Sequence, residues 1–363
     1  MGCFSSPLIH QEGYSKFSRR VHDKFLKNRI PVNAGIELTR KCNLQCVHCY
    51  ERGVSKNGRE ELSFLQLRGI LDQIAELGSL WLMLTGGEVL TREDFFDIYI
   101  YAKKKGFIIS VLSNATLITP EIADTFKKWK PFTVEIPLYG ADARTHDGVT
   151  GVKGSFDAAL KAIALLKERN VQVNLKTFVT SLNYQSLKDL NKFAANLGYG
   201  LSLDCAMFPC IDHSQEPYKY RLKPKEVFEV LFETLQNKKD YLKTVKETME
   251  NFSCSEESDY FYNCYAGKGI FFIDAFGFLD VCIFSRSLHY DLLKGSVKEA
   301  VEKHFPVIRG RKLEDNSKCR SCQMRNFCNF CPAIADLEAD KLNLDYYCET
   351  TNFLKGMAEK VAL

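Results

Sequence analysis

Three cysteines lie within eight positions after a short apolar segment: Cys42, Cys46 and Cys49, with the spacing Cys-x3-Cys-x2-Cys. Three thiolates leave one corner of an iron–sulfur cube without a protein ligand, just as a catalytic zinc keeps one position open. The spacing therefore predicts a [4Fe-4S] cluster with one iron free to bind and activate a small molecule. The alternative is a zinc loop completed by His48, which is disfavoured because adjacent residues in so tight a loop rarely bind one ion together.

The end of the next apolar run carries a second candidate ligand-binding motif, Gly86-Gly87-Glu88. A glycine pair lets the backbone approach a ligand that a side chain would block, and Glu88 adds a carboxylate that can face a cationic group. Further along, Lys176 places a charge within the apolar run Val171–Val179. This position predicts a core lysine that needs an anionic partner, either a ligand carboxylate or an ordinary ion pair.

Most of the remaining cysteines gather near the C-terminus, in the order Cys264, Cys282, Cys319, Cys322, Cys328, Cys331 and Cys348. The chain has fourteen cysteines and lacks the apolar core of a signal peptide, which favours metal binding or catalysis over disulfides. A four-cysteine zinc ribbon is the alternative for this region. Cys205 and Cys210 lie outside the series and are expected to be small buried hydrophobes.

Together these motifs resemble those of the radical S-adenosylmethionine (SAM) enzymes, and the C-terminal series resembles their SPASM extension. The resemblance implies that Cys42, Cys46 and Cys49 hold a [4Fe-4S] cluster whose open iron binds SAM, and that SAM is reductively cleaved to a 5′-deoxyadenosyl radical. It also implies SAM contacts from His48 to the adenine, from Gly86, Gly87 and Glu88 to the methionine amino group, and from Ser113 and Asn114 to the ribose. The anionic partner of Lys176 is then either the SAM carboxylate or an ordinary ion pair. For Ser113 and Asn114, an ordinary turn is about as good an explanation.

The same resemblance divides the C-terminal cysteines between auxiliary [4Fe-4S] clusters. One set comprises Cys319, Cys322, Cys328 and Cys348, and the other comprises Cys264, Cys282 and Cys331. The second set is one ligand short, so either Cys254 supplies the missing thiolate or the site stays open. One or two auxiliary clusters are therefore expected.

The chain between these motifs alternates short apolar runs with amphipathic helical segments, which is typical of repeated βα units and a parallel sheet. Active sites of parallel barrels lie at the carboxyl ends of the strands, and both the cysteine loop and Gly86-Gly87-Glu88 follow such runs. Six candidate strands predict a partial (β/α)6 barrel of the radical SAM type in the α/β class: Gly35–Leu38, Leu80–Leu84, Ile108–Leu112, Thr133–Leu138, Val171–Val179 and Leu201–Asp204.

Capping signals predict where several helices begin. The caps are Ser63 with Gln66, Thr91 with Asp94, and Thr119 before Pro120. Gly78 predicts the end of the first of these helices. A charged helical stretch is expected from Pro224 to about Met249.

The composition is that of an ordinary soluble globular chain: 363 residues, of which 45% are hydrophobic and 26% charged. The expected division is an N-terminal extension over 1–32, a radical SAM barrel over 33–245 and a small cysteine-rich, SPASM-like domain over 246–363. Apolar stretches fall short of the roughly 18 residues of a membrane helix, so a cytoplasmic protein is expected. A net charge of +4 without a basic stripe argues against nucleic acid as a partner.

The resemblance implies an enzyme that crosslinks, oxidises or epimerises a peptide or protein and that takes electrons from a donor such as a flavodoxin or ferredoxin. Ile283 stands where sulfatase-maturing relatives carry an Asp, which disfavours that subclass. Two alternatives remain open. One is a haem-precursor side-chain modifying enzyme of the same superfamily, and the other, from a different class, is a zinc-binding regulatory or scaffold protein. No catalytic residue beyond the cofactor ligands is assigned.

Overall fold

The computed structural model describes most of the chain. The described residues are 14–27, 30–51, 58–233, 237–251, 260–262, 264–286, 288–314, 317–328, 330–338 and 342–360. Cys254, the candidate fourth ligand of an auxiliary cluster, lies outside them.

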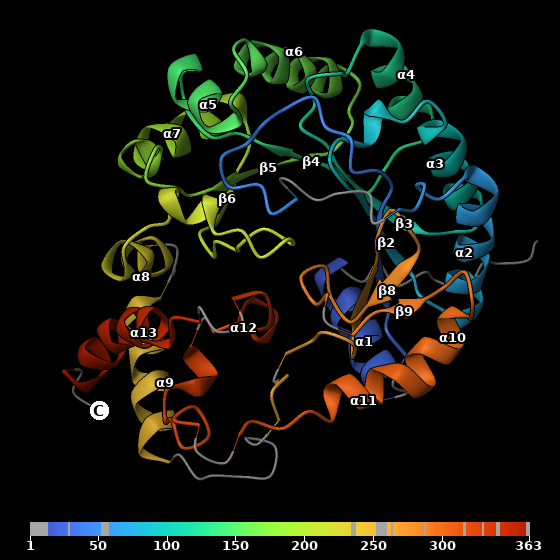
Figure 1. Cartoon of the computed structure of the whole chain (residues 1–363). Helices are drawn as coiled ribbons and strands as arrows, with labels where there is room; N and C mark the ends of the chain where they lie inside the picture. The colour runs from blue at the N-terminus through green and yellow to red at the C-terminus, as the bar shows by residue number, and fades with distance from the viewer. Residues whose placement is uncertain are drawn as a thin grey trace, which may run out of the picture.

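Six parallel strands form a curved sheet with helices along its outer side (Figure 1). The strands are β1 (Asn33–Glu37), β2 (Trp81–Thr85), β3 (Ile108–Leu112), β4 (Thr133–Pro137), β5 (Val173–Phe178) and β6 (Leu201–Asp204). Each strand pairs with the next one along the chain. The predicted partial (β/α)6 barrel is confirmed, and every predicted strand overlaps an observed one.

The outer helices return the chain from each strand to the next. They are α2 (Phe64–Leu77), α3 (Phe95–Lys104), α4 (Pro120–Lys128), α5 (Ala143–Thr150), α6 (Ser155–Glu168) and α7 (Leu187–Leu197). Ser63 and Gln66 form the predicted capping box of α2, Gly78 ends that helix at φ 93°, and Thr119 caps α4. The prediction for Thr91 is wrong: Asp94 is the N-cap residue of α3, and Thr91 ends a short 3-10 helix, where its hydroxyl donates to the Glu88 carbonyl oxygen.

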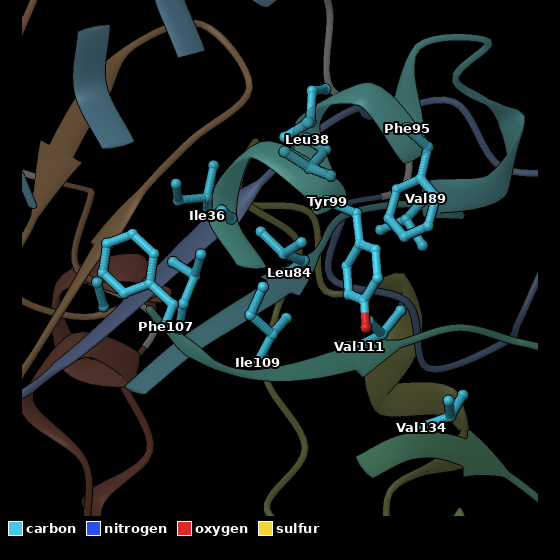
Figure 2. Close-up of a cluster of buried hydrophobic side chains, with 14 of the residues drawn as sticks. Ile36, Leu38, Leu84, Val89, Phe95, Tyr99, Phe107, Ile109, Val111 and Val134 are labelled. Atoms are coloured by element: carbon cyan, nitrogen blue, oxygen red, sulfur yellow. The ribbon is translucent and has the colours of Figure 1, made fainter. Parts of the chain in front are cut away.

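The main hydrophobic core lies between the sheet and the outer helices. Figure 2 shows side chains of β2 and β3, among them Leu84 and Val111, beside Phe95 and Tyr99 of α3, and all four are fully buried. Burial alternates along the strands because successive side chains point to opposite faces. We call the face that points away from the outer helices the inward face. Its residues are Asn33, Gly35, Glu37, Trp81, Met83, Thr85, Ile108, Ser110, Leu112, Thr133, Glu135, Pro137, Asn174, Lys176, Phe178, Ser202 and Asp204.

The C-terminal region extends the same sheet. Strand β7 (Ile270–Ile273) adds in parallel to β1, and β8 (Phe278–Asp280) and β9 (Tyr290–Asp291) follow in antiparallel pairs. The helices of this half are α8 (Pro224–Glu233), α9 (Lys238–Glu250), α10 (Val297–Glu299), a π-helical turn (Ala300–His304), α11 (Phe305–Arg309), α12 (Pro332–Glu338) and α13 (Leu344–Glu359). The charged helical stretch predicted from Pro224 is therefore two helices, and α13 packs against both (Figure 1).

Helix α1 (Tyr14–Lys27) covers the amino-terminal ends of the first two strands. The indole Nε1 of Trp81, the first residue of β2, donates to Tyr14 Oη over 3.0 Å. The His22 ring lies 4.8 Å from that of Trp81, and His22 Nε2 is 3.1 Å from the side-chain amide of Asn33, the first residue of β1. This helix therefore covers the end of the barrel opposite the cysteine loop.

Candidate functional site

The loop of Cys42, Cys46 and Cys49 follows β1 at the carboxyl end of the sheet, as the sequence predicts. Backbone hydrogen bonds fix it to the end of α5: Gln45 N donates to Thr150 O and Val47 N to Val149 O, both over 2.9 Å. Cys42 is exposed and the other two thiols are half-buried. The loop thus presents three thiols at the open end of the barrel.

The three thiols lie near one another around the buried ring of Tyr139. Burial raises the pKa of the Tyr139 hydroxyl, and all three thiols raise it further. Burial likewise raises the pKa of Cys42, and that of Cys49 to about 11. Such thiols stay protonated in water, and coordination to a metal is the interaction that stabilises their thiolates.

The donor set fits an iron–sulfur cluster. The Leu44 amide donates to Cys42 Sγ over 3.4 Å, and Asn114 Nδ2 lies 3.9 Å from the same sulfur. Such donors stabilise negative sulfur. In the described part of the chain, no three His, Cys, Asp or Glu side chains are placed to hold a single metal ion. Cluster ligands bind different irons and need not converge on one point, so the arrangement suits a cluster.

Gly86 and Gly87 bring the end of β2 against the cysteine loop. A Cβ on Gly86 would lie 2.3 Å from Thr39 O, and one on Gly87 would lie 2.4 Å from Lys41 O. The amides of Gly87 and Glu88 donate to these same two carbonyl oxygens over 2.8 Å. Because glycine has no side chain, Gly86 and Gly87 let the backbone of the cysteine loop approach closely. The sequence had suggested that this space was for a ligand.

Glu88 is 1% exposed, and both of its carboxylate oxygens are occupied within the protein. Oε1 accepts from Leu90 N over 3.1 Å and from Ser113 Oγ over 2.8 Å, and Oε2 accepts from Asn114 N over 2.6 Å. Burial raises its pKa. The carboxylate thus fixes the turn after β3, while the Asn114 side chain lies at the rim beside Cys42 and bonds to Asn43 Oδ1 over 2.9 Å.

His48 forms an aromatic group with two residues that sequence reasoning did not assign. Its ring stacks on Phe178 of β5 with centroids 4.8 Å apart and planes within 7°, and it meets Tyr139 edge-on at 5.1 Å. Its Nε2 lies 3.3 Å from Tyr139 Oη. Tyr139 lies directly after the fourth predicted strand, and this position could have indicated that it belongs to the site.

The expectation of a core position for Lys176 is wrong. Its side chain is 48% exposed and forms an ion pair with Glu135 of β4. Lys176 lies in the alternating pattern of β5, with its neighbours Leu175 and Thr177 on the helix-covered face. Within the run Val171–Val179 the polar residues Gln172, Asn174 and Lys176 alternate with apolar ones, and this period-two alternation places the lysine on the inward face.

His146 and Asp147 hold a turn. Asp147 accepts hydrogen bonds from Gly154 N, Ser155 Oγ and Phe156 N at the start of α6, over 2.7 to 2.9 Å. His146 Nδ1 accepts from Tyr139 N over 3.1 Å, and burial lowers the pKa of the ring to about 4. The neutral imidazole therefore positions the backbone of Tyr139 above the cysteine loop.

The C-terminal cysteines come together in two groups. One cavity of about 620 Å³ is lined by five of them: Cys264, Cys319, Cys322, Cys328 and Cys348. Burial raises the pKa of Cys282 to about 12, and interaction with Cys331 and Cys264 contributes to the rise. Cys264 thus lies near both sets, and the division of the cysteines between two clusters stays a prediction.

Comparison with known proteins identifies the domain that carries this site. Residues 36–197 match the model of the Radical SAM superfamily. This segment begins in β1, contains the cysteine loop and Gly86-Gly87-Glu88, and ends with α7. It is a radical SAM domain.

Two kinds of curated relative are similar to this chain. The AdoMet-dependent heme synthase of Methanosarcina barkeri is 26% identical over 86% of the chain and 94% of its own length. The mycofactocin maturase MftC of Mycolicibacterium smegmatis is 33% identical over 48% of the chain and 44% of its own length. The subtilosin biosynthesis protein AlbA of Bacillus subtilis is 32% identical over 47% of the chain and 38% of its own length. The alignments with MftC and AlbA therefore span less than half of this chain and less than half of each relative.

Solved structures share the fold along nearly the whole chain. Streptococcus suis SuiB bound to the precursor peptide SuiA matches 96% of the chain and 83% of its own, with a TM-score of 0.66 and 18% identity. The protein anSMEcpe with bound AdoMet matches 92% of the chain and all of its own, with a TM-score of 0.64 and 19% identity. The match extends beyond the barrel to the C-terminal cysteine-rich region of this chain. No helix among the described residues is long and apolar enough to cross a membrane.

Sequence reasoning missed a buried charged network beside the cysteine loop. Arg286 Nη2 donates to Glu37 Oε1 over 2.8 Å, and Arg286 Nη1 lies 3.7 Å from Asp274 and 3.6 Å from Asp280. Arg40 lies 3.7 Å from both Glu37 and Asp274 and 3.9 Å from Glu51. Burial raises the pKa of the carboxyl groups in the network outside β1, which are Glu51, Asp274 and Asp280. The residues of this network come from segments far apart in sequence, so no local sequence motif predicts it.

Proposed function

We propose that this chain is a radical SAM enzyme that modifies a peptide or protein substrate, by crosslinking, oxidation or epimerisation. The observation that carries the proposal is the charge of the inward face. In its six strands, all of them within the described residues, Lys176 is the only cation, and Glu135 already neutralises it. Asp204 adds negative charge to the same face, whereas Glu37 is buried and paired with Arg286. A peptide fits such a polar, mildly acidic surface better than a substrate with several carboxylates.

The cofactor assignment is part of the proposal. Cys42, Cys46 and Cys49 would hold the [4Fe-4S] cluster, and His48 and Asn114 lie at the rim where SAM would contact the protein. When bound, this cluster would supply the electron that cleaves SAM to a 5′-deoxyadenosyl radical. Glu88 and Ser113 would act indirectly, because their hydrogen bonds fix the turn that carries Asn114.

The C-terminal region would hold auxiliary clusters. One set of ligands would be Cys319, Cys322, Cys328 and Cys348, and the other Cys264, Cys282 and Cys331. An electron donor such as a flavodoxin or ferredoxin would supply electrons to the cluster held by Cys42, Cys46 and Cys49. We keep the division at residue 245 for the two domains, although β7 joins the second to the sheet of the first.

A haem-precursor modifying activity is the second candidate. The M. barkeri heme synthase favours it, because that similarity spans 94% of the relative. Haem precursors carry carboxylate side chains, which would require unpaired cations on the inward face. The one cation of its six strands, Lys176, is already paired with Glu135. Adding iron coproporphyrin to the anaerobic holoenzyme would distinguish the two activities. A saturable absorbance shift, together with enzyme-dependent loss of mass from the tetrapyrrole, would contradict the peptide proposal.

Iron content tests the cluster assignment. Anaerobically reconstituted wild-type protein and the variant Cys42→Ala/Cys46→Ala/Cys49→Ala are compared for iron, sulfide and zinc per chain and for 5′-deoxyadenosine formation. The variant is expected to lose roughly four irons and all 5′-deoxyadenosine formation, while C-terminal iron remains. Unchanged iron, or zinc in place of iron, would refute the assignment. The matched control is Cys205→Ala, which removes a buried thiol outside both cysteine groups.

A further inference from the structure

Part of the inward face is filled by the protein itself. A Cβ on Gly35 of β1 would lie 2.2 Å from the ring of Phe272, which β7 places against it. Next along β1, Glu37 is fully buried beneath Arg286. A substrate therefore finds no room against β1.

The opposite part of the inward face is open. On β5, Asn174 and Lys176 are exposed, while Val173, Leu175 and Thr177 on the other face are buried. On β6, Ser202 and Asp204 are likewise exposed. Sheet register sets Ser202 beside Lys176. The accessible surface inside the barrel is thus a polar strip along β5 and β6.

This strip leads directly to the cysteine loop. Phe178 is the next inward residue after Lys176, and it stacks on His48, the residue before Cys49. Asp204 pairs in register with Phe178. A molecule bound along β5 and β6 would therefore reach the place where the radical is generated.

The strip carries one unbalanced charge. Lys176 is paired with Glu135. Asp204 accepts a hydrogen bond from Ala206 N over 2.9 Å, and no cation of the described part of the chain forms an ion pair with it. A carboxylate so placed attracts a cationic group from a ligand.

We propose that the inward face of β5 and β6 is the substrate-binding face, and that Asp204 binds a lysine or arginine side chain of the substrate peptide near the residue that is modified. The inference rests on the proposed peptide function and adds the charge of the substrate to it. Asp204 acts in recognition and selects which peptides bind.

Affinity selection with two peptide pools tests this inference. The pools are short acetylated peptides of random sequence with one central lysine, and matched peptides with glutamate in its place. Both are mixed with the anaerobic holoenzyme and SAM, and bound peptides are identified by mass spectrometry. Wild-type protein is expected to enrich the lysine pool about fivefold, which corresponds to about 1 kcal/mol. Asp204→Lys is expected to reverse the preference.

A charge reversal outside the barrel provides the matched control. Glu168→Lys, on an exposed site of α6, is expected to keep the wild-type preference. Iron per chain is measured for every variant, so that loss of the fold is recognised. A lysine preference that survives in Asp204→Lys would overturn the inference and leave the peptide function standing. Enrichment of neither pool, together with tight binding of iron coproporphyrin, would overturn both.

Discussion

The carboxylate of Glu88 and the ring of His146 act on the ligand site through other residues. Glu88 fixes the backbone of Asn114, and His146 accepts a hydrogen bond from the backbone of Tyr139. Each of these two partners lies at the rim of the cysteine loop. Buried polar groups in such positions need their partners, because an unsatisfied donor costs about 1 to 3 kcal/mol.

His146 makes stability depend on pH. Burial lowers the pKa of its ring from 6.5 to about 4. Between these values the unfolded chain binds a proton that the native ring does not, so stability is present above pH 6.5 and is lost as the pH falls towards 4. The loss attributable to this ring is at most about 3 kcal/mol. Urea unfolding across this range is expected to show a smaller loss for His146→Gln than for wild type, and equal losses would contradict the assignment.

Two elements make the site: the end of β2 and the loop after β1. Their backbones touch at Gly86 and Gly87, and the amides of Gly87 and Glu88 donate to the carbonyl oxygens of Thr39 and Lys41. The loop is fixed on its other side by the end of α5. Its geometry therefore depends on contacts from two elements that follow it in the chain.

A methyl group at Gly87 is expected to displace the cysteine loop. In Gly87→Ala the new Cβ would lie 2.4 Å from Lys41 O, which is backbone and yields only if the loop moves. We expect a destabilisation of about 2 kcal/mol or more and lower iron retention at the first cluster, measured by chemical denaturation and iron analysis.

Gly69→Ala is the control for this prediction. Gly69 lies on the exposed side of α2, and no atom of the described residues comes within 4 Å of the point that its Cβ would occupy. Alanine is expected to stabilise this helix by about 0.5 to 1 kcal/mol. Equal iron retention in Gly87→Ala and Gly69→Ala would contradict the proposed contact.

At the scale of the whole molecule, the buried charged network joins the barrel to the C-terminal region. Arg286 comes from the loop after β8 and contacts Glu37 at the end of β1, Asp274 after β7 and Asp280 in β8. Buried ion pairs contribute little net stability when complete, but losing one partner leaves a buried charge uncompensated. Arg286 therefore fixes the segment after Cys282 relative to the strand that leads into Cys42.

Arg286→Met is expected to lower the free energy of unfolding by about 3 to 5 kcal/mol, because three buried carboxyl groups lose their shared cation. Adding Glu37→Gln should recover part of the loss. Lys225→Met, which breaks an exposed ion pair, should change stability by less than about 0.5 kcal/mol. Chemical denaturation measures all three, and no recovery in the double variant would contradict a network centred on Glu37 and Arg286.

The capping box of Ser63 and Gln66, the cysteine loop and the six strands could all be predicted because each depends on short-range pattern. The place of Lys176 was also readable from short-range pattern, because Gln172, Asn174 and Lys176 alternate with apolar residues, and the expectation of a core lysine overlooked this alternation. The contacts of Gly86, Gly87 and Glu88 could not be predicted, because their partners Thr39, Lys41 and Ser113 lie in the segments that follow β1 and β3. The prediction that Thr91 caps α3 was wrong because the Thr91 hydroxyl donates to the Glu88 carbonyl oxygen. Asp94 is the N-cap residue of α3 instead.

The sequence by itself determined the ligand types and the βα order, because metal-binding spacing and helix and strand periodicity are properties of neighbouring residues. Only the tertiary structure decided how charge is distributed around the cysteine loop. It buried Glu37 and Asp280 against Arg286, paired Lys176 with Glu135 and left Asp204 open on β6. These residues are distant in sequence, and the curvature of the sheet brings them to one face, so their partners could be known only once the strands were in register.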